Sequence, residues 1–473
     1  MKKNLMNKKI SFFFSLLLIT FVVFMGFLIR LDPDYFWHIK AGEVMFHQVV
    51  LTKDIFSWFV SGQYWMSHEW LFEWILYGLK HLFGSIHPLV YSLLGMGLLS
   101  FILFYPNLEE MQKNIPYTLL YLIFFFVLFV GCVQARPHLI SYSFLAYTIW
   151  SLSDLYKNEE SKKIYFLPVV TLLWANIHGG SSNLSYLLCF LFLFGGLFSF
   201  QFKKIEAKKM NKKKRKKIFL VMILCMFAVC INPHGFKMFL YPYQNMMDTT
   251  MIHNISEWRS TSLNERYHLF YYAFLLFVIF TMLFSEKKIQ WMDFLLLGFV
   301  SYLGLKSIRF WPFIYIVMTY LIFHYVKPRK MDHGTSFCLG VLSIVLVSLT
   351  VLFGKALLPI SYQLNLDSSI VEVLEKEKPE RLFNMYDFGG ELIYHDIPVF
   401  IDGRADLYGK YNYKDYLELS MLQKDPVPLI QKYDFDYFLV KKDYPITFYL
   451  KNQDEYECIY QKKEILLYKK IVN

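Results

Sequence analysis

Two aspartates one residue apart follow the first long apolar stretch of the chain. Asp32 and Asp34 lie in the sequence Asp32-Pro-Asp-Tyr-Phe-Trp-His38. Two carboxylates at this spacing can hold a hard divalent cation, Mg²⁺ or Mn²⁺, or can share acid and base work. The other interpretation is an ordinary interfacial loop in which Asp32 caps a helix.

A second polar group follows in the same segment. The stretch from Trp65 to Trp70 reads Trp-Met-Ser-His-Glu-Trp, and its histidine and glutamate can complete the cluster that the aspartates begin. The tryptophans are typical of a membrane–water interface. We therefore predict that the catalytic residues are Asp34, Asp32, Glu69 and His68, and that Asp32 and Asp34 are the candidate metal ligands.

The composition favours a membrane protein, in which apolar helices would position these residues. Of the 473 residues, 56% are hydrophobic and 18% are charged, which argues against a large soluble enzyme and against disorder. Apolar runs of roughly 20 residues, the length that crosses a bilayer, recur up to residue 360. The fold class predicted is an α-helical polytopic membrane protein with about eleven transmembrane helices. They are expected near 10–29, 88–105, 117–135, 139–156, 164–178, 183–202, 218–232, 267–285, 292–308, 310–326 and 337–355.

Lysine and arginine are unevenly distributed and set the expected orientation. They concentrate in the short loops on one side, above all at 203–217. By the positive-inside rule this places the N-terminus in the cytoplasm and the C-terminal residues outside. The same punctuation of apolar spans argues against a nucleic-acid partner and favours anionic membrane lipid as the partner of 203–217. The amino-acid usage suggests the membrane of a bacterial cell.

The chain divides into two parts by pattern. Residues 1–359 are net positive and form the expected transmembrane core, with a first outer loop at 31–87. Residues 360–473 are net negative and are expected to form a small extracytoplasmic α/β domain. We predict strands at Pro398–Ile401, Tyr437–Val440 and Glu464–Tyr468, and helices at Val371–Glu377 and Tyr413–Leu422.

Further polar residues cluster at the expected outer ends of the spans. Charges at membrane depth are costly and point to function. Taken singly, each of these residues is a cap, a turn or an interfacial anchor, but together on one side they predict a substrate-binding site. Arginine and lysine can hold a phosphate or pyrophosphate there. The predicted residues are Arg136, His138, His178, His234, Glu257, Lys306 and Arg309.

This arrangement resembles the GT-C superfamily of integral-membrane glycosyltransferases. Asp32-Pro-Asp matches the acidic motif of that family in type and position. The stretches 32–38, 54–58 and 65–69 also resemble a largely uncharacterised bacterial group with the pattern D-x-D-x-W-W-H, D-x-F-S and W-x-x-H-E-W, with Phe36 where tryptophan is usual. The resemblance implies a multi-span core and a donor sugar linked to a polyprenyl phosphate.

A second likeness lies near the C-terminus. Tyr386-Asp387-Phe-Gly-Gly, followed by Asp402-Gly-Arg404, is similar to the W-W-D-Y-G region of oligosaccharyltransferase catalytic subunits. Met385 and Tyr386 stand where that region has tryptophans. The likeness implies that Asp387, Asp402 and Arg404 help to bind the acceptor.

The function expected from these observations is transfer of a sugar from a polyprenyl-phosphate-linked donor to an extracytoplasmic glycan, lipid or protein. The cofactor expected is Mg²⁺ or Mn²⁺, or none. Two alternatives stay open: a polysaccharide polymerase or ligase, and a non-enzymatic transporter or flippase of lipid-linked glycans. Transporters place charges near the bilayer midplane, whereas the polar groups here gather at one rim.

Overall fold

The computed structural model describes residues 2–48, 50–247, 258–326, 365–409 and 411–471. The predicted span at 337–355 and the candidate residue Glu257 lie outside them. The chain divides into two compact units. Unit 1 contains the described residues of Met1–Arg30, Phe83–Gln244 and Ile255–Ser361, and unit 2 those of Leu31–Leu82, Asn245–Asn254 and Tyr362–Asn473.

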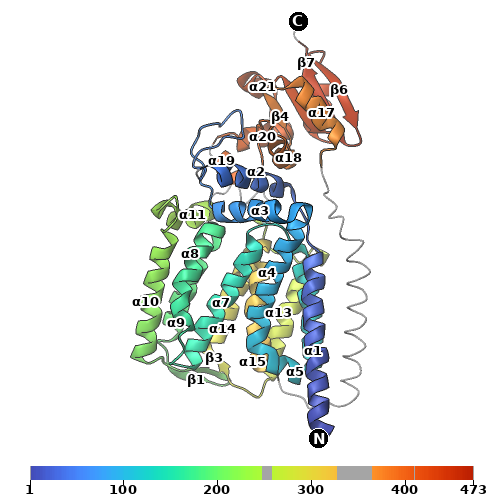
Figure 1. Cartoon of the computed structure of the whole chain (residues 1–473). Coiled ribbons are helices and arrows are strands. Elements are labelled where there is room, and N and C mark those ends of the chain that lie inside the picture. Colours follow the sequence, from blue (N-terminus) through green and yellow to red (C-terminus); the bar gives the residue numbers. More distant parts are fainter. Residues whose placement is uncertain (1, 49, 248–257, 327–364, 410, 472–473) are drawn as a thin grey trace. The chain divides into compact units, whose positions relative to one another are not determined.

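Unit 1 is a helical bundle, and many of its helices lie side by side in Figure 1. The helix α4 packs against α1 and α7, α10 packs against α8 and α9, and α14 packs against α15. The helices are α1 Lys2–Phe27, α4 His87–Phe104, α5 Leu108–Lys113, α6 Ile115–Phe129, α7 His138–Lys157, α8 Leu167–Ile177, α9 Leu184–Gly195, α10 Lys212–Val229, α11 Phe236–Met247, α13 Arg266–Phe284, α14 Trp291–Lys306 and α15 Trp311–Tyr325.

Short elements join these helices. One sheet of the order β1-β2-β3 pairs Phe200–Phe202 with Ile205–Ala207 and the latter with Ile289–Gln290. The 3₁₀ turns are η1 Gly84–Ile86, η2 Tyr105–Asn107, η3 Val130–Cys132, η4 Lys163–Phe166, η5 Gly179–Ser181 and η7 Ile308–Phe310.

The prediction of about eleven transmembrane helices is wrong. Among the residues that the structure describes, one helical stretch, Trp70–Lys113, is long and apolar enough to cross a membrane. Several predicted spans end early because turn residues interrupt them. The span expected at 183–202 is the 12-residue α9, which ends at Gly195 before strand β1 begins. At 1.5 Å per residue this helix is about 18 Å long, against a hydrocarbon core of about 30 Å.

Unit 2 combines two N-terminal helices with the C-terminal part of the chain. Its sheet has the order β4-β5-β7-β6, with β4 parallel to β5 and the other two pairs antiparallel. The elements are α2 Pro33–His47, α3 Trp70–Phe83, α17 Ser368–Glu377, β4 Leu382–Asn384, η8 Tyr386–Phe388, α18 Gly389–Tyr394, α19 Ala405–Tyr408, α20 Tyr413–Ser420, α21 Val427–Tyr433, β5 Tyr437–Lys441, α22 Pro445–Lys451, β6 Tyr456–Lys462 and β7 Ile465–Lys470.

Four of the five elements predicted in the C-terminal part are confirmed, namely α17, α20, β5 and β7. The strand expected at 398–401 is wrong. Val399 instead forms an isolated bridge with Ser57, and its N–H donates to the Phe56 carbonyl at 3.1 Å. An extended segment forms backbone hydrogen bonds with the extended segment that lies beside it. Here the neighbouring segment contains Ser57, which is far away in the sequence.

The same contact makes residues 31–82 part of the core of unit 2. The Trp58 indole donates to the Leu382 carbonyl at 3.0 Å, and its ring stacks on Phe400 at 5.6 Å between centroids. Trp37, Trp65 and Phe56 belong to the same buried cluster as the β-sheet residues. The domain boundaries predicted at 1–359 and 360–473 stay a prediction, but the described residues of 31–82 pack with the C-terminal part.

Candidate functional site

The first turn of α2 positions the aspartate pair. Asp32 is the N-cap, and its Oδ1 accepts a hydrogen bond from the Tyr35 N–H at 3.1 Å. Pro33 occupies the first helical position, where its missing N–H costs nothing. Asp34 therefore lies in the first turn, where the helix dipole favours a negative charge.

The start of α2 packs closely against two glycines from the C-terminal part. A Cβ on Gly403 would lie 1.7 Å from Oδ1 of Asp34, and a Cβ on Gly390 would lie 2.1 Å from the Pro33 carbonyl oxygen. Any other residue at either position would overlap α2. The close approach brings the Asp34 carboxylate against the backbone that joins Asp402 to Arg404.

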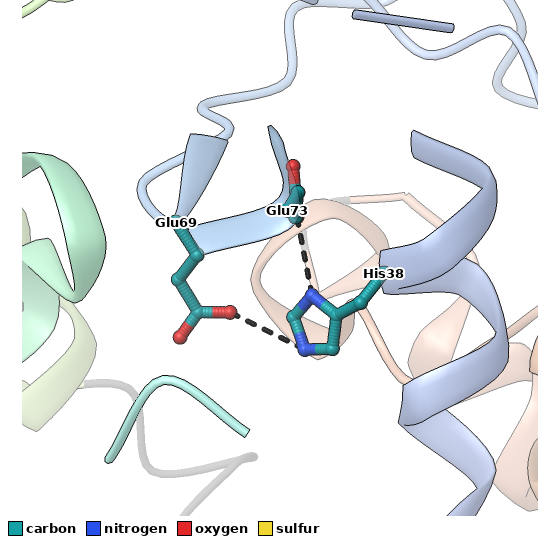
Figure 2. Close-up of side chains that lie close together, drawn as sticks. All are labelled: His38, Glu69 and Glu73. Atoms are coloured by element: carbon teal, nitrogen blue, oxygen red, sulfur yellow. Dashed lines mark hydrogen bonds and ion pairs between the residues drawn. The ribbon is translucent and has the colours of Figure 1, made fainter. Parts of the chain in front are cut away.

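One turn further along α2, His38 reaches two glutamates. Figure 2 shows its ring between Glu69 and Glu73. The distances are 3.5 Å from Nε2 to Oε2 of Glu69 and 3.2 Å from Nδ1 to Oε1 of Glu73. All three residues are buried, and Glu73 has no exposed surface. The Ser67 hydroxyl donates to the other oxygen of Glu73 at 3.0 Å.

The backbones of α2 and α3 approach closely at this point. A Cβ on Gly42 would lie 2.1 Å from the Glu73 carbonyl oxygen and 3.0 Å from Cβ of Tyr77. Because residues four apart share a helix face, Gly42 and His38 face α3 together. The missing side chain of Gly42 is what allows His38 to reach the carboxylate of Glu73.

His68 extends this cluster on the other side of Glu69. Its Nε2 lies 3.4 Å from Oε1 of Glu69, and its Nδ1 lies 4.0 Å from Oδ2 of Asp406. Burial disfavours the charged ring, but the carboxylates of Glu69 and Asp406 outweigh burial and raise the pKa of His68 to about 9. Two imidazole rings therefore face one buried carboxylate.

These residues can hold a metal ion. One atom from each of His38, Glu69 and Glu73 lies within 4.8 Å of the others, and this is the one such group among the described residues. Asp32 and Asp34 are not members of it, so their predicted metal role stays a prediction. His38 and Glu73 are not among the site residues predicted from the sequence. The four-residue spacings Asp34–His38 and Glu69–Glu73 were the signal that could have found them.

The predicted acceptor residues Asp402 and Arg404 lie in a buried ionic network. The guanidinium donates to both carboxylate oxygens of Asp402 at 2.9 and 2.6 Å and to Oδ1 of Asp54 at 2.6 Å. Tyr408 donates its hydroxyl to Asp402 at 2.5 Å. The Arg404 guanidinium also lies over the Trp65 ring, 4.7 Å from its centroid. The side chains of Arg404, Asp54 and Asp402 are at most 1% exposed, and they join the segment 31–82 to the C-terminal part.

Asp387, the third predicted acceptor residue, is the half-buried middle residue of η8. It pairs with Lys441 on β5, and its carbonyl accepts from the Asn365 amide at 3.2 Å. Acceptor binding by Asp387, Asp402 and Arg404 stays a prediction. The geometry gives the latter two a supporting role for the loop that faces Asp34.

In unit 1, Arg136 and His138 lie at the start of α7. The Tyr91 hydroxyl donates to the Arg136 carbonyl at 2.6 Å, and the His138 ring contacts the Cys132 carbonyl at 3.2 Å. His178 is buried beside the same helix, with Nδ1 2.7 Å from the Ser141 hydroxyl. His138 and His178 thus lie near the same end of α7, since His138 begins the helix and His178 contacts Ser141 in its first turn.

The remaining predicted residues of unit 1 lie on other turns. His234 is buried, and its N–H donates to the Asn232 side chain at 2.7 Å. Lys306 ends α14 and is exposed, and its carbonyl accepts from Ser260 at 3.2 Å. Exposed Arg309 lies over the Trp258 ring, 5.3 Å from its centroid. Substrate binding by these residues stays a prediction.

Comparison with known proteins adds evidence on the fold. The sequence matches no protein-family model and no curated protein. Two crystal structures of the Archaeoglobus fulgidus oligosaccharyltransferase are similar to this chain, one in the apo form and one tethered to an acceptor peptide containing the NVT sequon. The TM-scores are 0.56 and 0.53 at 10% and 11% identity, with 91% of this chain and 70% and 69% of the others covered. At this identity the likeness shows the fold alone, which is similar to that of the archaeal oligosaccharyltransferase.

Proposed function

We propose that this protein is a membrane-bound glycosyltransferase that moves a sugar from a polyprenyl-phosphate-linked donor to an acceptor outside the cytoplasm. The observation that carries the proposal is the likeness to oligosaccharyltransferase over 91% of the chain, together with a first-turn aspartate held against the C-terminal part. The apolar helical stretch Trp70–Lys113 supports residence in a membrane.

The reaction in the proposal requires a base and stabilisation of a leaving phosphate. The acceptor oxygen or nitrogen attacks the anomeric carbon, the sugar–phosphate bond breaks, and the lipid phosphate leaves with the bonding electrons. Asp34 takes the proton that the acceptor loses. Asp32 starts the helix that presents Asp34. The candidates for contact with the donor phosphate are the cationic side chains of unit 1, Arg136, Lys306 and Arg309.

The similar structures bear on the class of acceptor. One of the archaeal structures holds an acceptor peptide, which supports a peptide as one candidate beside a glycan or a lipid. Here Met385 and Tyr386 replace the two tryptophans of the acceptor motif that the sequence resembles. We therefore expect an acceptor other than the NVT sequon.

The experiment compares three variants of the full chain in membranes supplied with a radiolabelled undecaprenyl-phosphate-linked sugar. Asp34→Asn should lower transfer by about a hundredfold or more, since a general base is lost. Asp32→Asn keeps the helix cap, so it separates capping from chemistry. Asp454→Asn, at an exposed site, is the control. Unchanged transfer by a normally expressed Asp34→Asn variant would remove Asp34 from the mechanism.

A further inference from the structure

The buried cluster around His38 has an unusual charge pattern. Glu69 and Glu73 are both buried, and a buried carboxylate is costly unless a positive partner compensates it. His68 lies beside Glu69, whereas Glu73 accepts a hydrogen bond from the neutral Ser67 hydroxyl. His38 turns one ring nitrogen toward each glutamate. A neutral imidazole has one N–H and one lone pair, so one carboxylate would face the lone pair.

The three groups lie close enough together to share one ion. Nδ1 of His38 is within hydrogen-bond distance of Oε1 of Glu73 at 3.2 Å, and Nε2 lies 3.5 Å from Oε2 of Glu69. One atom from each of the three residues lies within 4.8 Å of the others. Ligands of one ion lie about 3.0–3.5 Å apart when each bond is about 2.1 Å, so a small movement of these side chains would gather them around a cation.

We propose that His38, Glu69 and Glu73 bind a divalent transition-metal ion, Mn²⁺ or Zn²⁺, that joins α2 to α3. One nitrogen of a neutral His38 binds the ion, and the other donates its N–H to a carboxylate. One divalent ion offsets the charge of the two carboxylates, and His68 borders the cluster through Glu69. The imidazole favours Mn²⁺ or Zn²⁺ over Mg²⁺ and Ca²⁺, which prefer all-oxygen sites.

The site is built into the contact between the two helices. Gly42 lets the α2 backbone approach Glu73, and the Ser67 hydroxyl donates a hydrogen bond to Oε2 of Glu73. Such hydrogen bonds from outside the ligand set orient metal-binding groups. Asp34 lies one turn before His38 on α2, so the ion also fixes the direction in which Asp34 points. This positioning effect, unlike metal binding itself, rests on the proposed function.

The first experiment measures metal content and thermal stability of the purified full chain. The protein is stripped with a chelator, loaded separately with Mn²⁺, Zn²⁺, Mg²⁺ or Ca²⁺, and desalted. We expect about one equivalent of Mn²⁺ or Zn²⁺ and an unfolding midpoint raised by several degrees. His38→Gln and Glu73→Gln should lose at least about four-fifths of the metal and the metal-dependent shift. Glu43→Gln, on the same helix, should keep both.

A second measurement does not depend on any variant folding. X-ray absorption of the zinc-loaded natural chain should show one imidazole nitrogen and oxygen ligands at about 2.0–2.2 Å. An all-oxygen shell, a chain that retains neither Mn²⁺ nor Zn²⁺, or full metal content in a folded His38→Gln variant would overturn the proposal. Neither readout uses sugar transfer. A chain that binds the ion at His38 but transfers no sugar would refute the proposed function and leave the metal site standing.

Discussion

Arg404 donates a hydrogen bond to Asp54 at 2.6 Å, although the two residues are 350 positions apart in the chain. Asp402 and Tyr408 complete the network, and the ring of Trp65 covers the guanidinium. One end of this contact belongs to the segment 31–82 and the other to the C-terminal part. The buried ion pair thus joins the two segments that form the surroundings of Asp34.

Replacing Arg404 should destabilise unit 2 severely. Arg404→Ala leaves the carboxylates of Asp54 and Asp402 buried without a cation, and breaking a buried ion pair from one side costs about 3–5 kcal/mol. The free energy of unfolding, measured by denaturant titration of the purified chain, checks this value. Arg381→Ala removes the exposed partner of Asp434 and should change stability little. Equal losses in the two variants would contradict the supporting role of Arg404.

Gly403 and Gly390 should respond differently to the same substitution. Gly403→Ala places a methyl group on the carboxylate of Asp34, a short side chain that can turn away. We expect the fold to persist and kcat for sugar transfer to fall by roughly a hundredfold, since the base is misplaced. Gly390→Ala meets the backbone of Pro33, which cannot turn, and should cost about 1–3 kcal/mol of stability.

The control for both is Gly97→Ala in α4, where an added Cβ meets nothing within 4 Å. This variant should keep its stability and its transfer rate. Transfer at the normal rate by Gly403→Ala would show that the position of Asp34 does not limit the reaction.

Glu391 should make stability depend on pH. Burial raises the pKa of Glu391 to about 7 in the folded chain. The backbone N–H groups of Asn365 and Leu366 donate to its carboxylate and lower the pKa, but burial has the larger effect. The folded state therefore holds this proton more tightly than the unfolded state, whose pKa is near 4.5. Its stabilising contribution is complete below about pH 4.5 and is lost as pH rises through 7, by roughly 3 kcal/mol.

The measurement is the unfolding midpoint of the chain between pH 4.5 and pH 8. Glu391→Gln removes the titrating group, so its midpoint should lack this fall. Glu375→Gln, at an exposed position on α17, should follow the natural chain. A natural chain whose midpoint rises over this range would contradict the assignment to Glu391.

Part of the candidate site could be predicted from the sequence. Asp32 and Pro33 carry the signal for a helix start, and the structure begins α2 there with Asp32 as its cap. His68 and Glu69, predicted as partners, do lie 3.4 Å apart. The partnership of His38 with Glu73 escaped prediction because it depends on the approach of α2 to α3 at Gly42. A pattern along the chain does not reveal which helix faces which.

By itself the sequence determined the local elements: the start of α2, the strands β5 and β7, and the helices α17 and α20, because caps and alternating apolar residues act within a few positions. The helix lengths predicted from the sequence were wrong, because an apolar run continues past the residue, such as Gly195, or the 3₁₀ turn at which the helix ends. Only the tertiary structure decided that the segment 31–82 packs with the C-terminal part. Contacts such as Arg404 with Asp54 and Ser57 with Val399 follow from burial and long-range pairing, which residue spacing does not encode.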